Sequence, residues 1–386
     1  MKFDLFLLAL IILPLECERA NYTNPVIKVE SPDPFVIKGH DNYYYLFTSD
    51  EKIYRSRDLV NWNFHGKAFE NTTSRPSFIN TGNTYWNPCI TKQNSSYILY
   101  FSLSNGGDDN GIGVATSSNP GGPFNIMNEN GKLFINKEID VDKSINPRYI
   151  EDAGNKYIIF GYKNGIYGIE LSSNGTSVKN INNKFQLAGN AFDLPFIYIR
   201  NNYYYLFASI GECCLKYSSD NNEQIVVGRA DTFKGPYMSQ NKESMCNNKY
   251  EVLISKNNIY YSAGSISIIN DTEKTWIIYH AIITGKATYN GTRYSCIDEL
   301  KWDSNDWPYI DGNSPSNERK VGPIILTDVD TSLEKSNILT DIDTSFEKSN
   351  ILTNDDTSFE SIYKDDINIL IKVNIFIIII LLLLKL

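Results

Sequence analysis

One two-strand pattern recurs five times along this 386-residue chain. Its first copy, Ser31–Ser49, has an acid before a proline (Asp33-Pro34), a short apolar run, a polar turn and an aromatic-aliphatic run, Tyr43–Phe47. Two β-rich runs joined by a turn-rich break predict a hairpin. The later copies are Tyr85–Ser104, Ile145–Lys163, Phe192–Ile210 and Ser262–Ile282.

The spacing of these copies predicts a β-propeller. The aromatic residue that opens each second strand falls at intervals of 54, 60, 46 and 73 residues, at Tyr43, Tyr97, Tyr157, Tyr203 and Trp276. Repeats of ~40–50 residues with several strands each are typical of propeller blades. We therefore expect an all-β, five-bladed β-propeller over residues 24–326. An antiparallel sandwich is the alternative, but it would show turns every ~8–12 residues and no longer period.

Four copies begin with a proline that follows Asp or Asn within two positions. Proline is tolerated at the first residue of a strand, where no ladder donor is needed. The pattern places Asp33, Asn87, Asn146 and Asp193 at equivalent points of successive inner strands, which converge on one channel mouth in a closed ring. Two carboxylates at such a mouth suit glycosidic cleavage, because one can protonate the leaving oxygen while the other activates water. For Asp33 alone, a turn cap is the alternative.

Other chemistries find little support in the sequence. It has no G-x-S-x-G elbow, no P-loop and no dinucleotide glycine motif. The three histidines, His40, His65 and His280, fall in a turn, after a strand end and inside a strand, which argues against a histidine-based triad. No cysteine spacing fits zinc, and Cys246 is a candidate disulfide partner for Cys213 or Cys214.

The N-terminal segment predicts secretion. Lys2 precedes an apolar run, Leu5–Leu15, that is too short to span a bilayer and fits a signal peptide over residues 1–20. Six N-x-S/T sequons are compatible with a secreted glycoprotein, and they lie at Asn21, Asn71, Asn94, Asn174, Asn270 and Asn290.

The C-terminal part has a different composition. Thr327–Leu339 is nearly repeated as Thr340–Leu352, and residues 327–366 carry 11 acids and 3 lysines, a net −8 out of −9 for the chain. We expect a disordered acidic stalk there, and a near-neutral propeller that binds no nucleic acid. Residues 367–386 contain a run of ten apolar residues, Ile375–Leu384, and resemble a lipid-anchor signal. A terminal membrane segment is the second alternative and a shifted reading frame the third.

Several segments, in order, carry a resemblance to a known family. They are SPDPFVIK…NYYYLFTS…RSRDLVNW, YILYFSLS…GIGVATSSNPGGPF (Tyr97–Phe124), NKYIIFGYKNGIYGIEL (Asn155–Leu171), YYYLFASIGECC…VVGRADTFKGPY (Tyr203–Tyr237) and IIYHAI…ELKWDSNDWP (Ile277–Pro308). Over about 280 residues the chain resembles glycoside hydrolase family 43, the five-bladed propellers that cleave arabinans and xylans. The double cysteine followed by VGR and GPY is most similar to the endo-1,5-α-L-arabinanase branch.

The resemblance implies roles for four positions. Asp33 matches the family's general base, and Asp193 falls on its general acid, normally Glu. Asn146 falls on the acid that tunes the general acid, normally Asp. Ser265 stands at the position where the family has a histidine near a central metal ion. The resemblance therefore leaves open whether a Ca²⁺ is bound at the centre, and it makes no cofactor certain.

These departures have physical consequences. Shortening Glu to Asp draws the proton back, and a misplacement of ~1 Å can cost ~100-fold in rate. Asn in place of Asp removes a negative neighbour that would raise the pKa of the acid. Four acids are candidates to compensate, and they are Asp140, Asp142, Glu151 and Asp152.

Three functions follow from this sequence. The first is a secreted or surface-attached monomeric hydrolase of α-1,5-arabinan or a related plant polysaccharide, acting by inversion, with Trp86, Asn87 and Phe192 as substrate-binding candidates. The second is a catalytically impaired, carbohydrate-binding propeller derived from such an enzyme. The third, a protein-interaction propeller, would leave Asp33 unexplained.

Overall fold

A computed structural model describes residues 19–69, 84–104, 110–126, 131–212, 222–283 and 291–324. The chain divides into two compact units, Met1–Leu326 and Thr327–Leu386. Within the described residues, no helix is long and apolar enough to cross a membrane. Most of the expected signal peptide, the acidic repeats and the apolar C-terminal tail lie outside these residues, so those expectations remain predictions.

The described part of the first unit contains five antiparallel sheets that follow one another along the chain. Blade I consists of β2 (Phe35–Lys38), β3 (Tyr44–Phe47), β4 (Lys52–Ser56) and β5 (Asn63–Lys67). Blade II consists of β6 (Thr84–Gln93), β7 (Ser96–Ser104), β8 (Gly111–Ser117), β9 (Asn125–Ile126) and β10 (Lys132–Ile135), and is followed by the short helix α2 (Asn136–Ile139). Blade III consists of β11 (Arg148–Asp152), β12 (Asn155–Phe160), β13 (Ile166–Glu170) and β14 (Phe185–Ala188).

The last two blades repeat this order. Blade IV consists of β15 (Asp193–Arg200), β16 (Tyr203–Ile210), β17 (Gln224–Ala230) and β18 (Glu251–Ile254), with the 3₁₀ turn η2 (Met245–Asn247) before β18. Blade V consists of β19 (Tyr260–Asn270), β20 (Thr275–Ile283), β21 (Tyr294–Trp302) and β22 (Pro308–Tyr309), followed by η3 (Asp311–Asn313). The five expected hairpins form the first two strands of the five blades, which confirms the five-bladed propeller.

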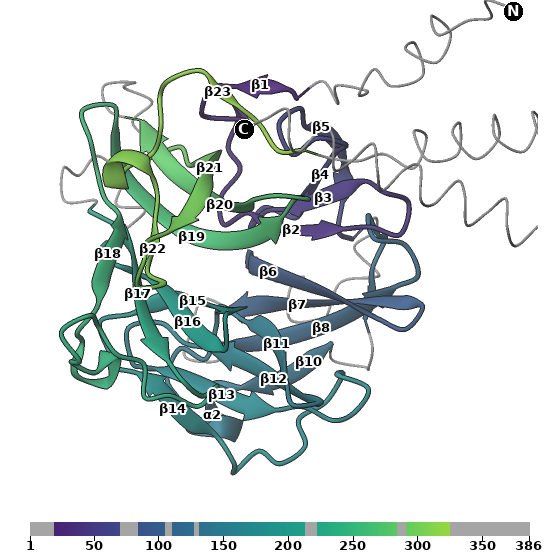
Figure 1. The fold of residues 1–386 in the computed structure, drawn as a ribbon. Helices are drawn as coiled ribbons and strands as arrows, with labels where there is room; N and C mark the ends of the chain where they lie inside the picture. Colours follow the sequence, from purple (N-terminus) through teal and green to yellow (C-terminus); the bar gives the residue numbers. More distant parts are fainter. Residues whose placement is uncertain are drawn as a thin grey trace, which may run out of the picture. The chain divides into compact units, whose positions relative to one another are not determined.

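The first strands of the blades surround one axis (Figure 1). β2 contacts β6, β6 contacts β11, β11 contacts β15, β15 contacts β19, and β19 contacts β2. This closed cycle brings the start of each inner strand toward a common centre, which we call the hub.

Five apolar clusters fill the five interfaces between neighbouring blades in the described residues. The second strands explain how, because successive side chains of a strand point to opposite faces. In β3, Tyr45 and Phe47 pack into the cluster shared with blade II, whereas Tyr44 and Leu46 pack into the cluster shared with blade V. A strand buried on both faces is apolar at every position, which is why the aromatic runs were so conspicuous in the sequence.

The chain ends of this unit close the ring. β1 (Asn21–Tyr22) pairs with β23 (Lys320–Val321) beside blade V. The buried amide of Asn24 donates to Ile297 O at 2.9 Å and accepts from Ile297 N at 2.8 Å. The segment before blade I is therefore hydrogen-bonded to β21 of blade V.

Two surface expectations can be compared with this fold. Cys246 is exposed, but Cys213 and Cys214 lie outside the described residues, so the candidate disulfide remains a prediction. The sequon residues within the described part are all exposed, and they are Asn21, Asn94, Asn174 and Asn270.

Candidate active site

One residue per blade has a positive φ near the hub. These residues have φ between 47° and 64°, and they are Asp33, Asn87, Asn146, Leu194 and Ser265. Asn and Asp tolerate this left-handed conformation, whereas leucine adopts it at a cost. In blade IV the position falls on Leu194, so Asp193 lies one residue earlier than the equivalent point that we expected.

The hub is held by a hydrogen bond that recurs from blade to blade. Ser49 Oγ accepts from Asn87 N at 2.9 Å, Ser102 Oγ accepts from Asn146 N at 2.8 Å, and Ser209 Oγ accepts from Ser265 N at 3.1 Å. His280 takes this place for blade I, with Nδ1 3.2 Å from Asp33 N.

Blade III departs from the pattern because Gly161 stands at the corresponding position of its second strand. Glycine has no side chain to accept the next amide, so Asp193 accepts from Leu194 N through its own Oδ1 at 2.7 Å. This local substitution fixes the orientation of the Asp193 carboxyl.

Asp33 is buried among positive groups. Its Oδ2 accepts from Ser49 Oγ at 2.5 Å and from Arg293 Nη1 at 3.2 Å, and its Oδ1 lies 3.3 Å from His280 Nδ1. Burial alone would raise the pKa of Asp33, but Arg293, His280 and Ser49 outweigh it and hold the pKa well below its usual range. Asp33 is therefore ionised at neutral pH.

His280 joins Asp33 to a second buried acid. Its Nε2 lies 2.9 Å from Glu223 Oε2, and both side chains are at most 3% exposed. Gly264 permits this approach, because a Cβ there would overlap with the Glu223 carboxylate. Burial favours the neutral ring, but Glu223 and Asp33 outweigh it and raise the pKa of His280 to about 9. In the protonated ring, Nδ1–H points at Asp33 Oδ1; in the neutral ring, Nδ1 accepts from Asp33 N.

Asp193 lies in a chain of amides on the other side of the hub. Asn87 Nδ2 donates to Asn146 Oδ1 at 2.8 Å, and Asn146 Nδ2 donates to Asp193 Oδ1 at 2.5 Å. Burial, followed by the negative charge of Glu223, raises the pKa of Asp193 well above its usual value. Asp193 Oδ1 accepts from both Asn146 Nδ2 and Leu194 N, which leaves Asp193 Oδ2 to carry the proton.

The other expected residues have mixed surroundings. Asn87 also accepts from Arg148 Nη2 at 2.9 Å, so its amide is engaged within the hub. Trp86 is half-buried on β6. Phe192 is fully buried and packs in the apolar cluster between blades III and IV, so the structure gives it a core position in place of the expected contact with substrate.

None of the four compensating acids belongs to these hub contacts. Asp140, Asp142 and Glu151 are exposed, and Asp152, at the end of β11, accepts from Tyr204 OH of β16 at 2.5 Å. Glu223 supplies the negative neighbour of Asp193 instead. That expectation was wrong because Asp140 and Asp142 lie in the connection after α2, and Glu151 and Asp152 lie at the end of β11 away from Asn146.

Comparison with known proteins decides the family. The sequence model of the family described as "Glycosyl hydrolases family 43" matches residues 22–308. The chain belongs to glycosyl hydrolase family 43. It is 28% identical to an extracellular exo-α-(1→5)-L-arabinofuranosidase of Cellvibrio japonicus, over 74% of this chain and 87% of that protein.

Other family 43 proteins are similar over a comparable length. An extracellular endo-α-(1→5)-L-arabinanase of Bacillus subtilis is 29% identical over 72% of this chain and 86% of that protein. A Cellvibrio cellulosa α-L-arabinanase, solved with arabinohexaose, superposes with a TM-score of 0.63 at 26% identity and covers 73% of this chain and 95% of that one. The chain is thus a family 43 protein of the arabinanase type.

The central ion expected from family 43 does not fit these residues. Ca²⁺ takes six to eight oxygen ligands. At Ser265, however, a cationic group is already in contact, because Nη2 of Arg148 lies 3.3 Å from Ser265 Oγ. The described residues contain no group of three or more His, Cys, Asp and Glu that could hold a metal.

Sequence reasoning missed four hub residues of this family 43 chain: Arg148, Glu223, His280 and Arg293. His280 was discounted because it sits inside a strand, but it pairs there with Gly264, next to the hub residue Ser265. No spacing rule connects it to Glu223, which enters from blade IV. Gly264, whose Cβ would overlap with that acid, was the one indirect signal in the sequence.

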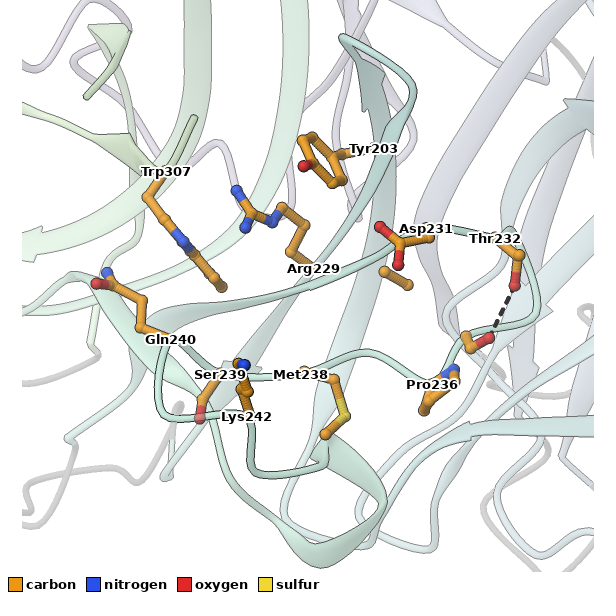
Figure 2. Close-up of a pocket in the computed structure, with 12 residues that line it drawn as sticks. Tyr203, Arg229, Asp231, Thr232, Pro236, Met238, Ser239, Gln240, Lys242 and Trp307 are labelled. Atoms are coloured by element: carbon orange, nitrogen blue, oxygen red, sulfur yellow. Dashed lines mark hydrogen bonds between the residues drawn. The ribbon is translucent and has the colours of Figure 1, made fainter. Parts of the chain in front are cut away.

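A separate cavity of about 410 Å³ lies on the outer part of blade IV (Figure 2). Arg229 lies between the rings of Tyr203 and Trp307, 4.2 and 4.7 Å from their centroids, and donates to Asn305 O at 2.6 Å. The arginine therefore fastens blade IV to the β21–β22 connection. None of the hub residues lines this cavity.

The buried histidine predicts a pH dependence of stability. The folded pKa of His280, about 9, exceeds the unfolded value of 6.5. Its contribution is therefore fully present below pH 6.5 and is lost as pH rises through 9, an effect on the order of 3 kcal/mol. We expect His280→Gln to be much less stable than the wild type at pH 6, with the gap in unfolding free energy narrowing toward pH 9.

Urea unfolding followed by tryptophan fluorescence across this pH range measures that gap. The control is His65→Gln, since His65 is exposed on β5. Burial lowers the pKa of His65, so this variant should depart from the wild-type profile only below about pH 6.5 and match it from there to pH 9. A His280→Gln gap that stays constant from pH 6 to pH 9 would show that the histidine is neutral in the folded protein.

Proposed function

We propose that this protein is a glycosidase that cleaves α-1,5-arabinan or a related plant polysaccharide, by an inverting mechanism with two carboxyl groups. The observation that carries the proposal is the opposite pKa shifts of the two hub acids: the pKa of Asp33 is lowered and that of Asp193 is raised. Two titratable groups whose environments separate their pKa values are the pattern of a base and an acid in one site.

In this mechanism Asp33 is the general base. Ionised at neutral pH, it orients a water molecule and takes its proton as the water attacks the anomeric carbon. Arg293 and His280 hold the carboxylate in place and keep it charged, which also makes it a weaker base. Arg293 and His280 act as positioning residues.

Asp193 is the general acid. Its protonated Oδ2 delivers the proton to the leaving glycosidic oxygen, while Oδ1 stays bound to Asn146 Nδ2 and Leu194 N. Asn146 is a neutral orienting group at the position where the family has an acid. Burial, followed by the negative charge of Glu223, raises the pKa of Asp193 and keeps it protonated.

A carbohydrate-binding propeller without turnover is the second candidate. The observation in its favour is the ion pair of Asp33 with Arg293, at 3.2 Å, which engages the same carboxylate that would activate water. The neutral side chain of Asn146 and the short side chain of Asp193 also favour this second candidate.

Incubation of the purified protein with debranched arabinan separates the two candidates. Reducing-sugar release, with the first-formed anomer identified by proton NMR, is expected to give products of inverted configuration. Retarded migration in an arabinan-containing native gel without sugar release would support the binding propeller. Neither release nor retardation would contradict both.

We further propose that the protein is secreted or held at the cell surface. Two relatives that it resembles are named extracellular. Residues 1–20 would act as the signal peptide, residues 327–366 as an acidic stalk, and residues 367–386 as a lipid-anchor signal or membrane segment. The exposed sequons would carry glycans, and the propeller would act as a monomer.

A further inference from the structure

Arg148 reaches across the hub. It opens β11 of blade III, and its Nη2 donates to Asn87 Oδ1 of blade II at 2.9 Å and to Ser265 Oγ of blade V at 3.3 Å. Blades III and V are not neighbours in the ring. A single side chain can join blades II, III and V only if its guanidinium lies close to the axis.

The remaining contacts support this position. Nη1 donates to Pro147 O at 2.9 Å and to Pro88 O at 3.3 Å. The guanidinium carbon lies 5.4 Å from the ring centroid of Phe35 in blade I. Four of the five N–H groups thus donate to oxygens, and Nε has no hydrogen-bond partner within the described residues. The fork of arginine suits such a set of fixed acceptors.

The burial of this charge requires compensation. Arg148 is only 2% exposed, and an arginine remains protonated in proteins. Burial lowers the pKa of Arg148, while Cys89, Asp33 and Asp193 act in the opposite direction. A buried cation is tolerated when it is hydrogen-bonded and near a negative group, and here the four hydrogen bonds and the ionised Asp33 meet these conditions.

We propose that the guanidinium of Arg148 takes the place of a central metal ion in this propeller, so that the folded protein requires no bound cation at its axis. Ser265 stands where a metal-binding histidine would be expected, and its hydroxyl faces Arg148. A Ca²⁺ bound to that hydroxyl at ~2.3–2.6 Å would lie within about 6 Å of Nη2, and like charges at that distance repel strongly in a buried site.

The first test uses the wild-type protein and its melting temperature, independently of any activity. A central ion present at ~1,000 times its Kd would raise the melting temperature by several degrees. We expect the same melting temperature in EDTA and in millimolar Ca²⁺, and no stoichiometric metal by elemental analysis. A fall in EDTA, or one equivalent of bound metal, would overturn the proposal even if the protein proves to be a glycosidase.

The second test restores an ion site. Ser265→His alone keeps the guanidinium and should remain unresponsive to Ca²⁺. The double variant Arg148→Asn, Ser265→His removes it, adds an oxygen ligand, and should gain a Ca²⁺-dependent rise in melting temperature. A folded double variant whose melting temperature does not change with Ca²⁺ would contradict the proposal, because the guanidinium would then not be the group that excludes the ion. If that variant does not fold, the wild-type comparison still decides.

Discussion

Asp33→Asn is expected to abolish sugar release from arabinan, with a loss of about 10²–10⁴-fold in kcat, the usual contribution of a general base. The amide keeps the size of the side chain and its contact with Ser49, but it cannot take a proton from water. It also removes the negative charge that Arg293 and His280 share. Initial rates of reducing-sugar release at saturating arabinan measure the effect.

The matched control is Asp140→Asn. Asp140 is exposed, outside the hub, and has a positive φ of 51° that asparagine tolerates equally well. It should retain wild-type activity. Removing one partner of a buried ion pair can cost ~3–5 kcal/mol, so circular dichroism must show that Asp33→Asn is folded at the assay temperature. A folded Asp33→Asn that keeps most of the wild-type rate would place the base elsewhere.

Asp193→Glu is expected to raise kcat by about 10- to 100-fold, because a displacement of ~1 Å at the acid can cost ~100-fold in rate. The longer side chain moves the proton outward by one methylene, toward the leaving oxygen. Burial and Glu223 would keep the new carboxyl protonated, as they do Asp193. The measurement is kcat together with the alkaline limb of the pH–rate profile.

Two further variants make this result specific. Asp193→Asn cannot donate a proton and should lose activity, in the direction opposite to Asp193→Glu. Asp152→Glu lengthens an acid outside the hub and should change nothing beyond a small loss of its contact with Tyr204. An Asp193→Glu protein that is folded but slower than the wild type would show that the short acid is already adapted to this hub.

The sequence predicted the architecture well because the propeller is built from local signals. The five aromatic runs, the prolines at strand starts and the ~50-residue spacing each reflect a hairpin and its burial between two sheets. Asp33, Asn87 and Asn146 were placed correctly at equivalent points for the same reason, since the residue before each proline takes the left-handed conformation.

The offset of Asp193 marks the limit of that reasoning. The proline sets the strained position at Leu194, so the acid moves back by one residue and binds the amide that Gly161 leaves without a side-chain acceptor. A missing side chain in one blade thus determines the orientation of an acid in the next. The pairing depends on the ring order of the sheets, which only the folded molecule supplies.

By itself, the sequence determined five sheets, their order and which strand starts face the axis, because strand alternation and turn chemistry act over a few residues. Only the tertiary structure decided what fills the hub: His280 between two carboxylates, and Arg148 joining blades II, III and V. Those contacts form when the ring closes, and they bring together residues from separate sheets. Their strength comes from burial and opposite charge, neither of which leaves a periodic trace along the chain.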